Sequence, residues 1–170
     1  MSLGSQNLVF VGMPGSGKST VGVLVAKRLG LGFIDTDLLI QQHTGQTLQE
    51  TVNQEGYLAL RKIEEQVLLQ LDVQQHVIST GGSAVYSDAA MSHLKSGAKV
   101  IFLDITLNTV LRRIGDYSLR GISKRPDQTL VELYEERSGL YARYADYTVQ
   151  GDTLNQEQAC EAVVQYCKHL

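Results

Sequence analysis

Short apolar runs alternate with longer segments of mixed polarity along the whole chain. Five apolar runs predict β-strands, at residues 7–11, 33–35, 76–79, 99–103 and 147–149. Six longer segments have the spacing of amphipathic helices, at residues 18–29, 56–71, 88–95, 107–114, 130–144 and 155–169. In the second of these segments, apolar residues recur at intervals of three and four, which predicts one buried helix face: Leu60, Ile63, Val67 and Leu71.

The order of these elements predicts an α/β fold. Continuous apolar strands that are each followed by a helix are typical of a parallel sheet covered by helices on both faces. No internal repeat, low-complexity tract or linker divides the sequence, so residues 1–170 are expected to form a single domain. The first five residues, MSLGS, are interpreted as a tag or a disordered tail.

Composition and charge exclude several classes of protein. The net charge is −3 and there is no run of Lys or Arg, so a general nucleic-acid binder is not expected. No apolar run approaches the ~20 residues that cross a bilayer, and no secretory signal is recognisable, so we expect a cytoplasmic protein. The two cysteines, Cys160 and Cys167, share a predicted helix face with Val163 and Val164, which indicates packed thiols rather than a disulfide or metal site.

The strongest chemical signal is GMPGSGKST at residues 12–20, which fits the P-loop pattern GxxxxGK[ST]. A predicted strand precedes this segment and a predicted helix follows it, as phosphate binding requires. In such a loop Lys18 reaches the β- and γ-phosphates and the Ser19 hydroxyl binds Mg²⁺. The candidate nucleotide-binding residues of this segment are Gly12, Pro14, Gly15, Ser16, Gly17, Lys18, Ser19 and Thr20.

Two carboxylates follow the second predicted strand, at Asp35 and Asp37. The carboxyl ends of parallel strands open onto the ligand crevice, so both side chains are expected near the P-loop. Alternate residues of a strand point in opposite directions, which suggests that Asp35 faces Mg²⁺ and Asp37 faces an acceptor hydroxyl. The alternative interpretation is that Thr36 or Asp37 is only the N-cap of the next helix.

Five motifs in this order resemble the signature of the shikimate kinases. They are GMPGSGKSTVG from Gly12, Asp35-Thr36-Asp37, HTGQT from His43, LRKIEE from Leu60 and STGG from Ser79. The resemblance extends over residues 8–145. It implies a nucleoside-monophosphate-kinase-like fold, with a five-stranded parallel sheet of order 2-3-1-4-5 between helical layers and a mobile lid. It further implies a monomer that transfers the γ-phosphoryl group of ATP, with Mg²⁺, to the 3-hydroxyl of shikimate in aromatic amino-acid biosynthesis.

The resemblance also implies which residues bind the acceptor, within a region of about residues 36–71 and beyond it. Asp37 would hold the acceptor hydroxyls and act as the base, and Gly81 and Gly82 would let the backbone approach the ring. Arg61 and Arg137 would bind the carboxylate, because two planar guanidinium groups fix a carboxylate in one orientation. For both arginines the alternative is an ordinary ion pair with a glutamate on the same helix.

Residues 115–128 are the candidate lid, and they contain two candidate arginines for the transferring phosphoryl group, Arg120 and Arg125. Arg125 precedes Pro126 and resembles the Arg-Pro pair of the family; Arg120 stays open as a competitor. Arg112 and Arg113, on the preceding helix, resemble the position that stacks on adenine. Mg²⁺ would be held by Ser19 and, through water, by Asp35.

Three positions depart from the family pattern: Val52 replaces an aromatic residue, Ser83 a glycine and Gly139 a proline. All three are expected to border the acceptor site. They leave open a kinase of the same fold for another small hydroxy acid, such as gluconate. A P-loop switch module is a second alternative, which the Asp37 position and the two arginines disfavour.

Overall fold

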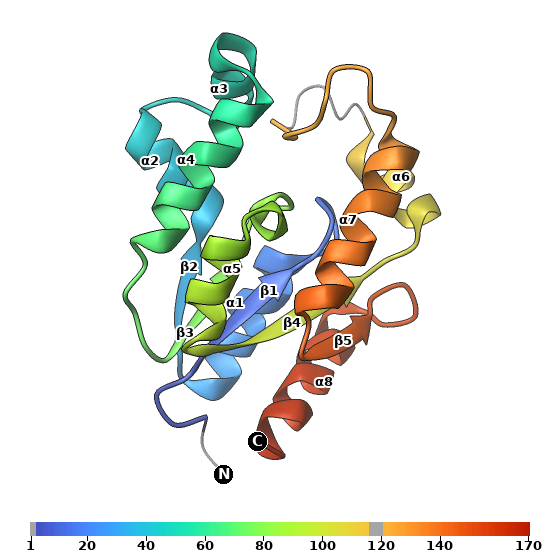
Figure 1. Cartoon of the computed structure of the whole chain (residues 1–170). Helices are drawn as coiled ribbons and strands as arrows, with labels where there is room; N and C mark the ends of the chain where they lie inside the picture. Colours follow the sequence, from blue (N-terminus) through green and yellow to red (C-terminus); the bar gives the residue numbers. More distant parts are fainter. Residues whose placement is uncertain (1–2, 116–120) are drawn as a thin grey trace.

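A five-stranded parallel sheet forms the centre of the computed structural model, which describes residues 3–115 and 121–170 (Figure 1). The strands are β1 (Asn7–Val11), β2 (Gly32–Asp35), β3 (His76–Ser79), β4 (Ala98–Asp104) and β5 (Tyr147–Gln150). Their order is β2-β3-β1-β4-β5, and every neighbouring pair is parallel. The predicted strands, the α/β class and the implied strand order are all confirmed.

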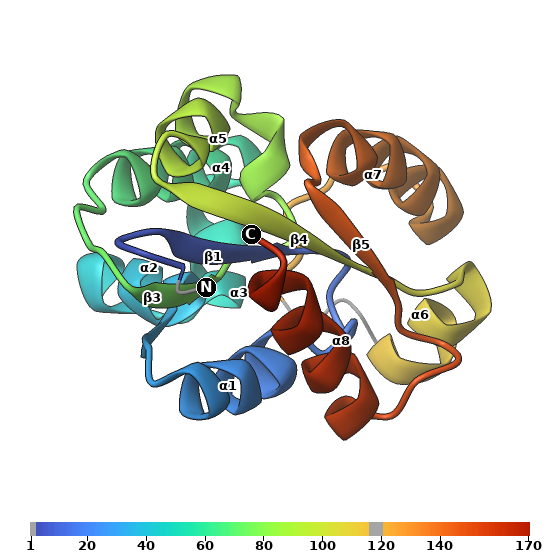
Figure 2. The same cartoon turned by 90° about the horizontal axis from the view of Figure 1, so that it is seen from below.

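Helices cover both faces of this sheet (Figure 2). α1 (Lys18–Leu29) and α8 (Gln156–Lys168) lie on one face, and α4 (Tyr57–Leu69), α5 (Asp88–Lys95) and α7 (Leu130–Tyr144) lie on the other. Side chains alternate along β1, so Leu8 and Phe10 pack on the α1 side while Val9 and Val11 pack on the α7 side. Because the central strand is buried on both faces, it is apolar at every position except Asn7.

Among the described residues, the structure also contains α2 (Thr36–Thr44), α3 (Leu48–Glu55), α6 (Leu107–Ile114) and the short 3₁₀ helix η1 (Ala84–Tyr86). All six helices predicted from periodicity are present, with α4 and α8 slightly shorter than expected. The periodic analysis did not predict α3, which is only 8 residues long and mostly polar. A capping box between Thr47 and Glu50 and the left-handed Gly56 define the two ends of this helix.

The predicted core positions are largely confirmed. Leu60 and Val67 of α4 are buried in a small cluster with Ile40, and Ile63 packs against it. Leu71 lies beyond the end of α4 and packs against the main core instead.

The cysteine prediction is also confirmed. Cys160 and Cys167 are buried beside Val163 and Val164, in the part of the core where α8 packs against α1. Burial raises the pKa of the Cys167 thiol to about 11, so this thiol stays protonated at neutral pH.

The carboxyl ends of the strands meet at one edge of the sheet, where the chemistry predicted from the sequence is gathered. The P-loop follows β1, α2 follows β2, and Gly81 and Gly82 follow β3. α2, α3 and α4 stand on one side of this edge, and α6 and α7 stand on the other (Figure 1). Within the residues that the structure describes, no helix is long and apolar enough to cross a membrane.

Candidate active site

The P-loop connects β1 to α1 through glycines whose backbone angles other residues rarely adopt. Gly15 has a φ of +80° and Gly17 a φ of +95°, in the left-handed region. Lys18 follows them and turns its ammonium group back onto the loop, where Nζ donates to the carbonyl oxygens of Gly12 at 2.8 Å and Met13 at 3.0 Å. Burial lowers the pKa of Lys18 to about 8, although the charge of Asp37 partly opposes this shift.

Three oxygen-bearing side chains meet beside the P-loop. The Ser19 hydroxyl donates to Asp35 Oδ2 at 2.8 Å and lies 3.1 Å from the hydroxyl of Ser79 at the end of β3. Asp35 Oδ1 accepts from the backbone N–H of Asp37 at 3.0 Å, so Asp35 itself is the N-cap of α2. The alternative interpretation, in which Thr36 or Asp37 is the cap, is therefore wrong. Asp35 and Asp37 diverge because one ends a strand and the other lies in the first turn of a helix.

A cavity of about 340 Å³ extends from the P-loop between α2, α4 and α7. Most of the candidate residues meet at its wall. The lining residues are Pro14, Gly15, Gly17, Lys18, Ser19, Thr20, Asp37, Ile40, Leu48, Leu60, Glu64, Thr80, Gly81, Gly82, Ser83, Gly121, Ile122, Ser123 and Arg137.

Two carboxylates, of the buried Glu64 and the partly buried Asp37, face each other across Gly81. A Cβ at this glycine would lie 2.7 Å from Asp37 Oδ1 and 2.7 Å from Glu64 Oε2, so any larger residue would displace one of them. Burial raises the pKa of Asp37, the nearby Asp35 raises it further, and Lys18 lowers it. Burial also raises the pKa of Glu64, to about 7, while a 2.5 Å hydrogen bond from the Ser83 hydroxyl to Oε1 opposes that shift.

Glu64 was considered from the sequence only as an ion-pair partner of Arg61, and its place in the cavity wall was missed. The sequence nevertheless contained evidence that Glu64 is buried. Glu64 lies one turn after Leu60 and one turn before Val67, so it occupies the helix face that was predicted to be buried. An acidic residue on such a face is unusual and indicates a functional or specifically paired group.

Arg61 and Arg137 approach each other at the loop that precedes α7, where both donate to Ser123. Arg137 is 1% exposed, and its Nη2 donates to the carbonyl oxygen of Ser123 at 2.7 Å. Arg61 donates to the same oxygen through Nη2 at 3.0 Å and to the Ser123 hydroxyl through Nε at 2.8 Å. Its guanidinium carbon lies 3.7 Å from the centroid of the Tyr86 ring, although Arg61 itself does not line the cavity.

Neither arginine forms the ion pair that was the alternative interpretation. Among residues 3–115 and 121–170, no ion pair includes Arg61 or Arg137. Gly82 leaves room for Arg137, because a Cβ there would lie 2.6 Å from its Nη1.

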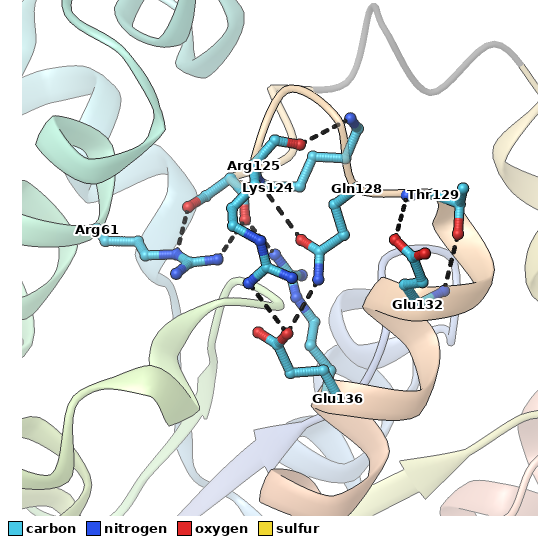
Figure 3. Close-up of polar contacts among 9 residues, drawn as sticks. Arg61, Lys124, Arg125, Gln128, Thr129, Glu132 and Glu136 are labelled. Atoms are coloured by element: carbon cyan, nitrogen blue, oxygen red, sulfur yellow. Dashed lines mark hydrogen bonds and ion pairs between the residues drawn. The ribbon is translucent and has the colours of Figure 1, made fainter.

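Arg125 does not line this cavity. Its guanidinium group lies 3.3 Å from the carboxylate of Glu136, and its side chain is 47% exposed (Figure 3). Gln128 donates to the same carboxylate at 2.9 Å. The other candidate of the lid, Arg120, lies outside the described residues.

A second cavity, of about 520 Å³, lies on the opposite side of the P-loop. Arg113 lines it and donates to the carbonyl oxygen of Gly15 at 3.0 Å. Ser16 and Asn155 also line this cavity, whereas the exposed Arg112 does not. Of the two arginines predicted to contact the adenine, only Arg113 therefore lies against the P-loop.

The three departures from the family pattern do not all border the acceptor cavity, contrary to expectation. Ser83 lines it. Val52 does not, because it packs beside Leu60 in the small cluster under α2 and α4. Gly139 lies away from it on α7, where an added Cβ would meet nothing within 4 Å.

A glycine loop between a buried strand and a helix, a buried lysine and an adjoining polar cavity define this protein as a P-loop nucleotide-binding protein. The model of the shikimate kinase family matches residues 14–168. The chain belongs to the shikimate kinase family, whose members transfer a phosphoryl group to an alcohol.

Relatives and solved structures agree with this assignment. The chain is 40% identical to a shikimate kinase from Mycobacterium avium over 93% of its length and 89% of that protein. It is 33% identical to one from Sulfurihydrogenibium, over 94% and 96% of the two chains. Its structure is similar to that of a shikimate kinase from Acinetobacter baumannii solved with shikimate, with a TM-score of 0.84 and 30% identity over 96% and 93% of the chains. A structure from Aquifex aeolicus gives 0.81 at 30% identity, over 95% and 96%.

Burial of Glu64 makes the stability of the fold depend on pH. A carboxyl group with a folded-state pKa of about 7 and an ordinary pKa of 4.5 binds more protons in the folded chain. The free energy of unfolding of the native chain should therefore fall as the pH rises from about 4.5 through 7. Since glutamine does not ionise, Glu64→Gln should stabilise the fold relative to the native chain by about 1–3 kcal/mol at pH 8 and by much less at pH 4.5.

Urea denaturation at both pH values measures this difference. The control is Glu55→Gln, at an exposed glutamate at the end of α3. Equal effects of Glu64→Gln at both pH values would contradict an ionised buried carboxylate.

Proposed function

We propose that this protein transfers the γ-phosphoryl group of ATP to the 3-hydroxyl of shikimate. The observation that carries the proposal is a pair of neighbouring arginines, Arg61 and Arg137, that form no ion pair within the described part of the chain. Arg137 lines the cavity that also contains the P-loop lysine and Asp37. Shikimate offers the two groups that this arrangement would bind, a carboxylate and neighbouring hydroxyls. The similarity to the A. baumannii structure, which was solved with shikimate, supports the same choice.

Arg61 and Arg137 are the proposed carboxylate-binding residues. The two like charges lie close enough that Arg137 contributes to a lowered pKa of Arg61, whose main cause is burial. A carboxylate between them would remove this repulsion and accept charge-assisted hydrogen bonds from both guanidinium groups. Such a contact fixes the ring, so that one hydroxyl group is held toward the nucleotide.

Asp37 is the proposed acceptor-hydroxyl ligand and base. Its carboxylate lies in the cavity wall between Lys18 and Gly81. A raised pKa makes this carboxylate a better proton acceptor, which suits removal of the hydroxyl proton at or after phosphoryl transfer.

The P-loop and Arg113 are the proposed nucleotide site. The positive φ angles of Gly15 and Gly17 shape the loop. Lys18 supplies a positive charge, and its Nζ donates hydrogen bonds to two carbonyl oxygens of the loop. Phosphate oxygens would replace those carbonyl oxygens as partners of Nζ. The cavity beside Arg113 lies next to the same loop and is the proposed place of the nucleoside.

The site also fits a magnesium ion. Ser19, Asp35 and Ser79 present only oxygen atoms, which Mg²⁺ prefers, and the Ser19 hydroxyl is already oriented by the Asp35 carboxylate. Ser19 would ligate the ion and Asp35 would hold it through water. When bound, Mg²⁺ neutralises charge on the β- and γ-phosphates.

Both lid arginines stay candidates for contact with the transferring phosphoryl group. Arg125 would have to leave Glu136 to reach it, whereas Arg120 immediately precedes Gly121, which lines the cavity. We further propose that residues 36–71 form the acceptor-binding region, that residues 115–128 form the lid and that the protein acts as a monomer.

Coupled ADP release at saturating Mg²⁺-ATP tests the acceptor. Shikimate should stimulate release by at least ~100-fold over the acceptor-free rate, because positioning of the acceptor supplies most of the catalysis in such a site. Gluconate should give little stimulation. Stimulation by gluconate but not shikimate would replace the proposed acceptor, and fast release without any acceptor would contradict a kinase.

Substitutions at Asp37 and Arg61 separate binding from chemistry. Asp37→Asn keeps the shape of the side chain but removes its charge, so kcat should fall by ~100-fold or more. Arg61→Lys cannot form a bidentate contact, so the KM for shikimate should rise ~10-fold or more with little change in the KM for ATP. Arg28→Lys, at an exposed ion pair with Glu161, is the matched control. Equal changes in both KM values for Arg61→Lys would indicate a purely structural arginine.

The buried lysine should make nucleotide affinity depend on pH. Lys18 has a pKa of about 8 in the free protein, and bound phosphates favour its charged form. Above pH 8 the complex must therefore take up a proton, so the affinity for ATP should fall by up to ~10-fold per pH unit.

Titration calorimetry between pH 6.5 and 9.5 measures this dependence. Lys18→Arg, which stays charged throughout, should bind ATP with a flatter profile. A flat profile for the native chain would show that Lys18 is already fully charged in the free protein.

A further inference from the structure

The carbonyl oxygen of Ser123 lies where an anion is expected. Both arginines donate to this one oxygen, at 2.7 Å from Arg137 and 3.0 Å from Arg61. We propose that the Ser123 carbonyl occupies the place of the acceptor carboxylate, and that the acceptor binds by displacing residues 121–123. This proposal rests on the proposed function, because it takes the two arginines as the carboxylate-binding pair.

The chemistry of the two ligands favours displacement. A carbonyl oxygen has no net charge, whereas a carboxylate carries a full negative charge and has two oxygens. The Nε of Arg137 is buried and, within residues 3–115 and 121–170, has no hydrogen-bond partner. A carboxylate could accept from the Nη2 atoms of both arginines and leave a second oxygen for this unused donor. The Ser123 carbonyl oxygen therefore accepts from only some of the N–H donors of the two arginines, and it does not neutralise their positive charge.

Residues 121–123 also form hydrogen bonds with α3 and α4, across the cavity from α7. The backbone N–H of Gly121 donates to the side chain of Gln49 on α3 at 2.7 Å. The Ser123 hydroxyl donates to the carbonyl oxygen of Tyr57, at the start of α4, at 3.2 Å. The segment therefore leads from the α7 side of the cavity to α3 and α4, and all three of its residues line the cavity.

This arrangement makes the affinity for the acceptor depend on how strongly residues 121–123 are held. When a binding-competent state is populated only in part, the apparent Kd is raised by the inverse of its population. Weaker attachment of the segment should therefore strengthen acceptor binding. A residue that merely positions Arg61 would have the opposite effect, so the sign of the change decides between the two roles.

Ser123→Ala tests the proposal. It removes the hydrogen bonds of the hydroxyl to Arg61 Nε and to Tyr57, and it leaves both arginines in place. The Kd for shikimate without nucleotide, measured by titration calorimetry, should fall by about threefold to tenfold. Ser92→Ala, at an exposed serine on α5, should leave it unchanged. An analogue with a hydroxymethyl group in place of the carboxylate should not gain kcat/KM in the Ser123 variant.

Gly121→Ala provides an independent test at the second attachment. Gly121 has a φ of +62°, and an added Cβ would lie 2.7 Å from the backbone nitrogen of Gln49. This variant should also bind shikimate more tightly.

The outcomes distinguish the two proposals. Weaker or unchanged shikimate binding by Ser123→Ala would overturn displacement and leave the acceptor assignment intact. No shikimate binding by the native chain would overturn both.

Discussion

Positive charge buried at the carboxyl edge of the sheet, which carboxylates among the described residues balance only in part, is the constraint on which the site depends. Lys18 and Arg137 are both less than 10% exposed, and among the described residues neither forms an ion pair. The Lys18 ammonium group and the Arg137 guanidinium group donate hydrogen bonds to backbone carbonyl oxygens of the P-loop and of Ser123. Carbonyl oxygens satisfy the hydrogen bonds but not the charge, so the folded chain retains a preference for anions at these two points.

The carboxylates of the cavity wall balance this charge only in part. Asp37 and Glu64 share the wall with Lys18 and Arg137, and burial raises the pKa of both acids while it lowers that of Lys18. With pKa values of about 8 and about 7, Lys18 and Glu64 both change their protonation near neutral pH. A bound phosphate or carboxylate would shift both equilibria, so ligand charge and protonation are linked throughout the cavity.

The sheet was predictable from the sequence because its central strands are buried on both faces and so consist of continuous apolar residues. The P-loop was predictable because its backbone angles require glycine. Helix α3 was not, since eight mostly polar residues give no clear periodicity. The alternative that Thr36 or Asp37 is the cap of α2 was wrong, because sequence alone does not show where β2 ends and the helix begins. The contacts of Arg61 and Arg137 with Ser123 join residues far apart in the chain, and no local pattern reports such contacts.

The two arginines are on helices that stand on different sides of the site. Arg137 is on α7, whose Leu133 and Tyr141 are part of the main core, whereas Arg61 is on α4, which places Leu68 in the main core but Leu60 and Val67 in the small cluster with Ile40. A ligand held by both would act as a cross-link between these helices, with an energetic effect comparable to that of an added tertiary contact. Much of its binding energy would then appear as reduced motion of α4 relative to the sheet, so the rigidity of the loaded enzyme would be a property of the acceptor as much as of the chain.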